Sequence, residues 1–307
     1  CDVQFFLARE KYMKEAGIKK EDLATWEGVE EACKKLKKIL PQGVYPIGFI
    51  GSRDWLGFET FLDFFASFGG NLFEPGTWNP ALNSPEGVAA LTFYKHLLDE
   101  YGTPGTPNWS YTEHLSAWNA GQMAMCLQYP NQESYNPSMA TIADETRWHM
   151  MIPKGPGPKG RYAPDGNLST SILGIPKNSA HKEAAFIFAA FLSSSEVSFI
   201  YTIPGTGMDP GRKSVFDLPL FKTLYMNHQA WLDSSPYVYF MARVPETAEL
   251  LMLASAEIHD ALTGRKTPKE ACDSMNAGWK EVMEKGGYFG PNAPKPSPLY
   301  MQEMLKK

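Results

Sequence analysis

Residues 112–128 read TEHLSAWNAGQMAMCLQ, which places a helix immediately before a strand. The pattern predicts a helix over Thr112–Ala120 that ends at Gly121, because glycine readily adopts the backbone conformation that follows a last helical turn. Met123–Gln128 is a mainly apolar run of strand length. A helix and an apolar strand joined by one turn are typical building blocks of α/β proteins.

The same alternation extends outward along the chain. Thr25 is a good N-cap for a helix over 26–40, and Ser84-Pro85 opens a helix over 87–101. Further helices are predicted over 8–17, 58–68, 180–192, 196–201, 217–232, 246–263 and 267–285. Strands are predicted over Cys1–Leu7, Tyr45–Ile50, Arg147–Ile152 and Ser171–Pro176. We therefore predict an α/β protein.

The composition excludes several classes of protein. Of the 307 residues, 43% are hydrophobic and 21% charged, which provides for a packed core and excludes a disordered or fibrous chain. The net charge of −5 argues against nucleic acid, or an anionic membrane, as the main partner. No run of about 18 apolar residues occurs, which argues against a transmembrane helix. The length predicts about two compact units.

The cysteines and histidines show no metal or redox motif. Cys1, Cys33, Cys126 and Cys272 stand far apart without a CxxC pair, which permits a disulfide without predicting one. The last three fall in apolar patterns, where a thiol packs as a small hydrophobe. No two histidines are four residues apart, and GxSxG, GxGxxG and GxxxxGKS/T are absent, so we expect no metal and no cofactor. Cys1-Asp2 fits either the lipid-modified start of a bacterial lipoprotein or, as we favour, an ordinary strand cysteine.

Polar and aromatic residues gather in the loops that follow predicted strands. These loops contain Arg53-Asp54-Trp55, Tyr129-Pro130-Asn131-Gln132, Asp165-Gly166-Asn167 and Asp209-Pro210-Gly211-Arg212. Planar Asp, Asn, Gln and Arg groups bond neighbouring hydroxyls in pairs, and aromatic rings stack on the C–H face of a sugar. The pattern favours a carbohydrate site. The alternative is structural: Trp55 as a half-buried anchor and Asp54 as a helix cap.

The carboxylates near Trp55 leave an enzyme as an alternative to a binding protein. Asp54, Glu59 and Asp63 cluster at one predicted loop–helix junction, and a glycosidase needs two acids placed across a bond. Such clusters more often serve as caps and solvated faces. A glycan-cleaving enzyme is therefore the alternative to a non-catalytic binding protein, and we expect no catalytic residue.

Eight segments in a fixed order carry a resemblance over nearly the whole chain. They are 9–18 (REKYMKEAGI), 25–29 (TWEGV), 68–73 (FGGNLF), 82–88 (LNSPEGV), 118–125 (WNAGQMAM), 174–179 (GIPKNS), 212–216 (RKSVF) and 264–271 (GRKTPKEA). Together they resemble the extracellular solute-binding proteins, family 1, the maltose-binding-protein-like sugar receptors of bacterial ABC importers. The resemblance implies a two-lobed Venus-flytrap fold.

The resemblance also implies how the lobes are divided along the chain. The first match falls where family members have already crossed into their second lobe, so the chain looks like the family without its amino-terminal part. Residues 1–168 and 217–307 would build the carboxy-terminal lobe, and 169–216 would belong to the amino-terminal lobe. The apolar face of that middle piece would then be poorly covered, and the missing part would be a separate chain or not represented.

The family's ligand lies between the lobes, and its contact loops match five stretches here. They are Arg53–Glu59, Tyr129–Gln132, Asp165–Asn167, Asp209–Arg212 and Tyr239–Glu246. Glu59, Tyr239 and Arg243 thereby join the candidate contacts Arg53, Asp54, Trp55, Tyr129, Asn131, Gln132, Gly166, Asn167, Asp209 and Arg212. Asn131 and Leu251 stand near the positions of the maltose receptor's prominent tryptophans, so the ligand stays open among an oligosaccharide, a disaccharide and a polyol.

The family's biology supplies the remaining expectations. The resemblance implies a monomeric receptor that delivers its ligand to the permease subunits of an ABC transporter. It implies a periplasmic or extracellular location, with a lipid anchor in the full-length precursor as one form. It implies no enzymatic activity.

Overall fold

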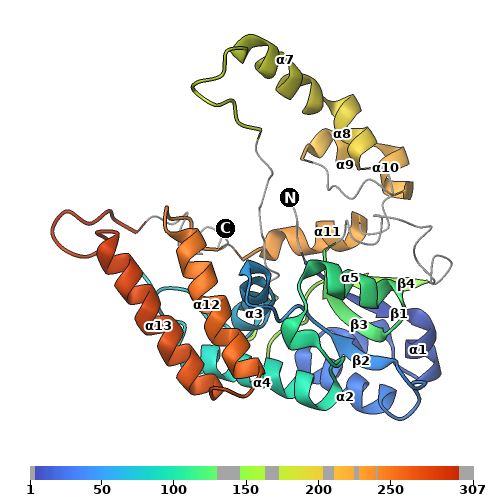
Figure 1. The fold of residues 1–307 in the computed structure, drawn as a ribbon. Helices are drawn as coiled ribbons and strands as arrows, with labels where there is room; N and C mark the ends of the chain where they lie inside the picture. Colours follow the sequence, from blue (N-terminus) through green and yellow to red (C-terminus); the bar gives the residue numbers. More distant parts are fainter. Residues whose placement is uncertain are drawn as a thin grey trace.

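The computed structural model describes residues 4–129, 146–162, 173–202, 211–224, 228–239 and 241–296. Its main body is an α/β unit around a four-stranded sheet in the order β2-β3-β1-β4 (Figure 1). The strands are β1 (Phe5–Arg9), β2 (Tyr45–Gly48), β3 (Met123–Gln128) and β4 (Arg147–Met150). β2 and β3 are parallel, whereas β1 is antiparallel to both of its neighbours. The predicted α/β class is confirmed.

Helices cover both faces of the sheet. In the body they are α1 (Glu10–Glu15), α2 (Trp26–Leu36), α3 (Trp55–Ser67), α4 (Pro85–Tyr101), α5 (Tyr111–Asn119), α11 (His228–Ser234), α12 (Thr247–Leu262) and α13 (Pro268–Lys285). Short 3₁₀ turns are η1 (Lys20–Leu23), η2 (Thr106–Asn108) and η3 (Ser235–Tyr237).

Alternation along β1 distributes the core between the two faces. Phe6 and Ala8 join the large cluster formed with α2, α3, α4, α12 and α13, whereas Phe5 and Leu7 join a smaller cluster with α5 and α11. Successive side chains of a strand point to opposite faces, so an entirely apolar strand requires cover on both. The fully buried β1 is therefore the centre of the body.

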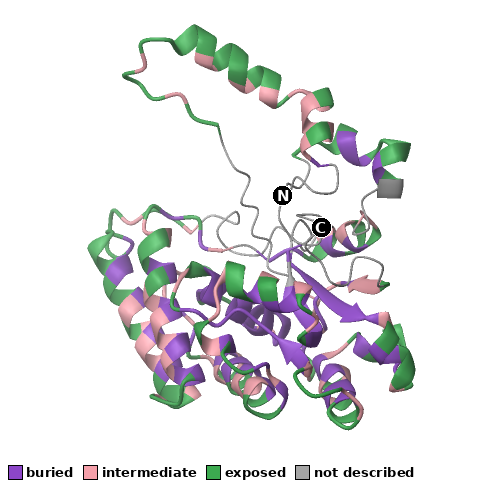
Figure 2. Cartoon of the chain, turned by 45° about the vertical axis from the view of Figure 1, so that its right-hand side comes forward, coloured by how far each residue is buried: buried purple, intermediate pink, exposed green. Residues whose placement is uncertain are grey.

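A separate arm extends away from this body (Figures 1 and 2). It contains α7 (Lys182–Leu192), α8 (Ser195–Tyr201), α9 (Lys213–Phe216) and α10 (Pro219–Leu224). Every residue of α7 is at least partly exposed, including Phe186, Phe188 and Phe191 at about 60%. The arm touches the body where Phe216 packs against Trp231 of α11, with ring centroids 4.3 Å apart.

Predictions that rest on local capping are confirmed. Thr25 accepts a hydrogen bond from the Gly28 amide at 3.1 Å, and Ser84 accepts one from Gly87 at 3.2 Å. β3 has the predicted bounds, Met123–Gln128. Cys33, Cys126 and Cys272 are buried, as expected; Cys1 lies outside the described residues.

Other boundaries differ from the prediction. α3 begins three residues earlier than predicted because the Asp54 side chain caps it. α2 ends at Leu36, not at residue 40. Of the helix predicted over 217–232, the described residues form α10 from Pro219 to Leu224 and α11 from His228; residues 225–227 lie outside the described ranges. Of the strand predicted over 171–176, the described residues 173–176 have no regular structure.

Candidate ligand-binding site

Several predicted site residues meet at one edge of the sheet. β2 and β3 are parallel neighbours, so their carboxyl ends lie at the same edge. β1 is antiparallel to β3, with Phe5 opposite Gln128, so its first residues lie at this edge too. The edge therefore holds the loop that leads from β2 into α3, Tyr129 after β3, and Gln4 before β1.

The first turn of α3 is fixed by Asp54. One carboxylate oxygen accepts from the Leu56 amide at 3.0 Å and from the Ser52 hydroxyl at 2.8 Å. The other accepts from the Ser110 hydroxyl at 2.5 Å, which ties this turn to the start of α5. Asp54 is thus the helix cap of the structural alternative, and it holds the neighbouring residue Trp55 in place.

Trp55 is the exposed aromatic residue of this edge. Its side chain is 44% exposed, although it stands at the first position of a helix whose following twelve residues are all buried. Trp26 and Trp118, in contrast, are fully buried. Trp55 therefore presents an indole surface to solvent from a rigid position, as stacking on a ligand requires.

Arg53 lies beside Trp55 and is held by a shared ion pair. Its guanidinium is 3.6 Å from Asp260 of α12, and Arg265 is 3.2 Å from the same carboxylate oxygen. Burial, followed by the charges of Arg53 and Arg265, lowers the pKa of the adjacent His259. Two guanidinium groups thus share one carboxylate, and Arg53 remains about half exposed.

The buried side chains of Glu59 and Tyr129 are hydrogen-bonded to each other at this edge of the sheet. The Tyr129 hydroxyl donates to a Glu59 carboxylate oxygen and accepts from the Gln4 amide nitrogen at 3.0 Å. All three residues are buried. Ile50, Leu56 and Tyr129 form one apolar cluster against which Tyr111 packs.

Tyr239 lies beyond the other end of α3. It is 2% exposed, and its hydroxyl accepts from the Leu72 amide at 3.0 Å. The Arg161 guanidinium lies 5.4 Å from the Tyr239 ring centroid and donates to the Ala66 and Gly70 carbonyls. Because α3 rises about 18 Å over its length, Tyr239 and Trp55 are not neighbours.

The remaining predicted contacts are dispersed or lie outside the described residues. Arg212 is in the arm, where it donates to the Ser193 carbonyl, and Arg243 is exposed near the start of α12. The residues outside the described ranges are Asn131, Gln132, Gly166, Asn167 and Asp209. Among the described residues, the candidate site is therefore the cluster of Arg53, Asp54, Trp55, Glu59 and Tyr129.

Two polar residues of the region were not predicted. Gln4 interrupts the apolar run that enters β1, and Arg161 follows a Pro/Gly-rich loop. A polar side chain in an apolar strand is a signal that it has a buried partner. Sequence alone did not identify that partner, because Gln4 and Tyr129 are 125 residues apart.

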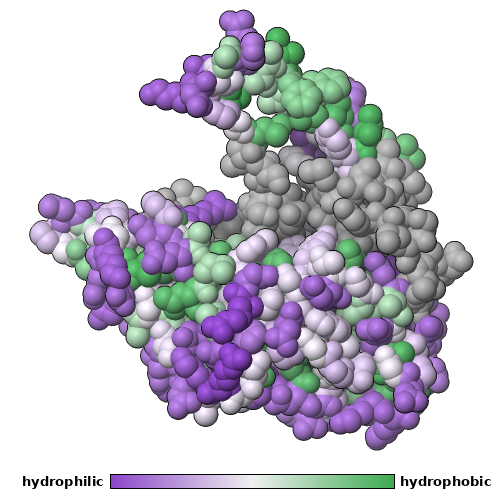
Figure 3. Space-filling view, in the orientation of Figure 1, coloured by the Kyte–Doolittle hydropathy of each residue, from purple (hydrophilic) through white to green (hydrophobic). Residues whose placement is uncertain are grey.

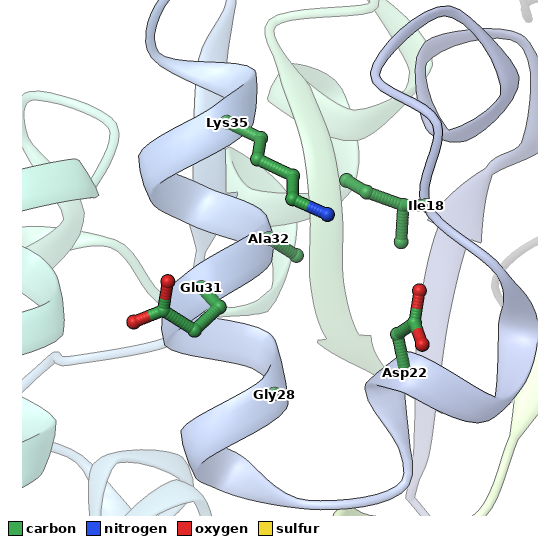
Figure 4. A pocket seen from close by; sticks show the side chains of 6 residues that line it. All are labelled: Ile18, Asp22, Gly28, Glu31, Ala32 and Lys35. Carbon is green, nitrogen blue, oxygen red and sulfur yellow. The ribbon is translucent and has the colours of Figure 1, made fainter.

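Two surface hollows lie away from this cluster. One, about 270 Å³, lies between η1 and α2 and is lined by Ile18, Asp22, Gly28, Glu31, Ala32 and Lys35 (Figure 4). The other, about 610 Å³, runs along α7 beside Ile175, Phe186 and Ile187, where apolar side chains gather on the arm (Figure 3). None of the predicted site residues lines either one.

Two kinds of feature are missing from the described ranges: a cluster of metal ligands and a single helix long and apolar enough to cross a membrane. There, we find no group of three or more His, Cys, Asp or Glu side chains suited to holding a metal ion. In the same residues no single helix has the length and apolar character needed to cross a membrane. Only α7 and α8 taken together have them, and these two helices are bent by 65° relative to one another.

The sequence matches a known family over most of its length. The model for bacterial extracellular solute-binding proteins matches residues 3–198. The chain belongs to this family. The mannitol-binding protein of Pseudomonas aeruginosa is 25% identical to this solute-binding protein in an alignment of 300 positions that covers 91% of this chain and 67% of that one.

Other relatives are longer than this solute-binding protein. The arabinooligosaccharide-binding proteins of Bacillus subtilis and Halalkalibacterium halodurans are 24% and 23% identical and have 61% and 57% of their length covered. The chain thus spans less than two thirds of these two relatives.

Solved structures share the fold. Maltose-bound MalE3 of T. maritima superposes with a TM-score of 0.81 at 22% identity, over 92% of this chain and 71% of that one. A solute-binding protein of Agrobacterium vitis with bound D-mannitol gives a TM-score of 0.77 at 22% identity, over 93% and 72%. The fold is that of the MalE-like periplasmic binding proteins, as the sequence resemblance implied.

Proposed function

We propose that this solute-binding protein is the receptor of an ABC importer and binds a sugar or sugar alcohol at the sheet edge that carries Trp55. The half-exposed indole on a rigid helix start is the observation that carries this proposal. A sugar or polyol offers C–H groups to the ring and hydroxyls to the adjacent Arg53 guanidinium. The relatives named for mannitol and arabinooligosaccharides support this ligand class.

A ligand panel tests the proposal directly. Isothermal titration with D-mannitol, ribitol, maltose and an arabinooligosaccharide separates polyols, disaccharides and oligosaccharides. We expect saturable binding of at least one ligand and weaker binding after Trp55→Ala. Phe289→Ala, which removes an aromatic side chain that is 36% exposed in the loop after α13, is the matched control. Binding that is unaffected by Trp55→Ala, or no binding at all, contradicts the proposal.

We infer further that the protein does not cleave its ligand. Asp54 accepts three hydrogen bonds as a helix cap, and Glu59 is fully buried under Tyr129. Neither carboxylate is thereby placed to reach both sides of a glycosidic bond. Incubation with the oligosaccharides of the panel, followed by chromatography, should return them unchanged. Product that disappears with Glu59→Gln would establish the enzyme instead.

We also propose that residues 169–216 belong to a different lobe from the sheet body. Their described part forms the arm, in which α7 exposes Phe186, Phe188 and Phe191. Large clustered apolar side chains normally have a covering partner. The protein should bind less of the dye 1-anilinonaphthalene-8-sulfonate when Phe186 and Phe188 are both changed to Ser. Unchanged dye fluorescence would show that this face is already covered.

The family relationship supports two proposals on biological context. We propose that the protein works outside the cytoplasmic membrane and hands its ligand to a permease. Cell fractionation tests the location, and ligand uptake in cells that lack the protein tests the transport role. Recovery of the protein in the cytoplasm of its own cells would contradict the first proposal.

A further inference from the structure

A buried hydrogen-bonded chain connects three elements beneath the proposed binding edge. The Gln4 amide donates to the Tyr129 hydroxyl at 3.0 Å, and that hydroxyl donates to Glu59. Gln4 is 2% exposed, Tyr129 6% and Glu59 0%. The chain therefore joins the entry of β1, the exit of β3 and the second turn of α3.

The hydroxyl of Tyr129 is committed to this chain. A tyrosine hydroxyl has one proton, and here that proton goes to the Glu59 carboxylate. A hydrogen bond to a charged, buried acceptor is among the stronger ones in proteins. Tyr129, which the sequence placed among the direct contacts, is thus held inside the edge and supports it from below.

The ring of Tyr129 transmits this constraint to the first turn of α3. It packs in one apolar cluster with Ile50 and Leu56. Leu56 directly follows Trp55, and its amide bonds the capping carboxylate of Asp54. A displacement of the Tyr129 ring would therefore move the turn that presents the indole.

From this arrangement we propose that Gln4 is a positioning residue for ligand binding: acting only through the Tyr129 hydroxyl, it fixes the first turn of α3 and so the orientation of Trp55. The proposal rests on the proposed function, because it assumes that a ligand is bound at Trp55. It also assigns a role to a residue that lies outside the contact loops. Its distinguishing consequence is that Gln4 has no effect on affinity once the Tyr129 hydroxyl is absent.

A double-mutant cycle tests this consequence. Gln4→Met keeps the length of the side chain without its donor, and Tyr129→Phe removes only the hydroxyl. We expect each single variant to bind D-mannitol about two- to tenfold more weakly, the range for one intramolecular hydrogen bond. The double variant should bind no more weakly than Tyr129→Phe alone, because contacting residues are not additive when one acts through the other.

The control is a tyrosine–glutamate hydrogen bond elsewhere in the body. The Tyr288 hydroxyl donates to Glu246 at 2.8 Å, and Tyr288 is 8% exposed, so Tyr288→Phe removes a comparable bond. Its melting temperature should fall with its mannitol affinity unchanged. Equal losses from Gln4→Met in both Tyr129 backgrounds, or unchanged affinity in a folded Gln4→Met variant, overturn the proposal. If Tyr129→Phe does not fold, the exchange measurement described next, made on Gln4→Met alone, decides the positioning role.

A second readout does not depend on ligand. Hydrogen–deuterium exchange of residues 55–62 in the unliganded protein should be faster in Gln4→Met than in wild type, with no further increase in the double variant. Unchanged exchange in this segment overturns the positioning role whether or not mannitol binds. Faster exchange in a protein that binds none of the panel ligands would show instead that the proposed function has failed while the mechanical link is real.

Discussion

Replacing Trp55 with alanine should weaken ligand binding without unfolding the protein. An indole side chain has about 250 Å² of surface, so an exposed fraction of 44% leaves about 110 Å² for a ligand to cover. If a sugar or polyol covers about half of this area, the loss is about 1.4 kcal/mol at 25 cal/mol per Å². Affinity should therefore fall about tenfold.

Calorimetric titration and thermal melting on the same preparation measure this effect. The fold should be retained, because Asp54 still caps α3 through the Leu56 amide and the exposed part of the indole packs against nothing. Trp26→Ala is the contrasting variant: that indole is fully buried and donates to Ser67 at 2.9 Å, so stability should fall by about 3–5 kcal/mol.

Two results would refute the reasoning. Unchanged affinity of a folded Trp55→Ala protein would end the stacking proposal. A large fall in melting temperature, comparable with that of Trp26→Ala, would mean that Trp55 belongs to the core and acts on binding through the fold.

Three further predictions concern the body. Arg9→Met should lower the free energy of unfolding by about 1–3 kcal/mol, because the Met123 carbonyl loses the Arg9 donor, whereas the Trp118 carbonyl still accepts from the Gly121 amide. A urea midpoint equal to wild type would contradict this. Burial raises the pKa of the Cys272 thiol to about 12 and that of Cys33 further still. Both thiols should therefore react with a thiol reagent at pH 8 only as fast as the protein opens, and rapid labelling of the native protein would contradict this. Hydrogen bonds from the Thr267 backbone and hydroxyl lower the pKa of Glu270 below 4.5, so its contribution to stability is complete above pH 4.5 and is lost as the pH falls through the lower folded value. Glu270→Gln should therefore flatten the acid part of a plot of melting temperature against pH. An unchanged slope would count against the capping box.

The elements that the sequence predicted well are those determined by interactions between residues close together in the chain. A side-chain cap such as Thr25 or Ser84 acts within three residues, and the apolar run of β3 contains its own signal. The order of the eight family segments likewise lies in the sequence, which is why the family and fold class could be recognised. The start of α3 was missed because the Asp54 cap and the apolar pattern beginning at Phe58 gave different boundaries.

Only the tertiary structure decided which candidate site residues are exposed and which are buried. Trp55 and Tyr129 are both aromatic residues next to a predicted strand end, yet one is 44% exposed and the other is buried. Tyr129 is hydrogen-bonded to Gln4, 125 residues from it, and to Glu59, 70 residues from it. Periodicity and capping act over a few residues, so they determine which segments become helices and strands. Burial and hydrogen-bond partners depend on which distant segments pack together, and so the sequence could name the candidates but not separate the exposed ones from the buried ones.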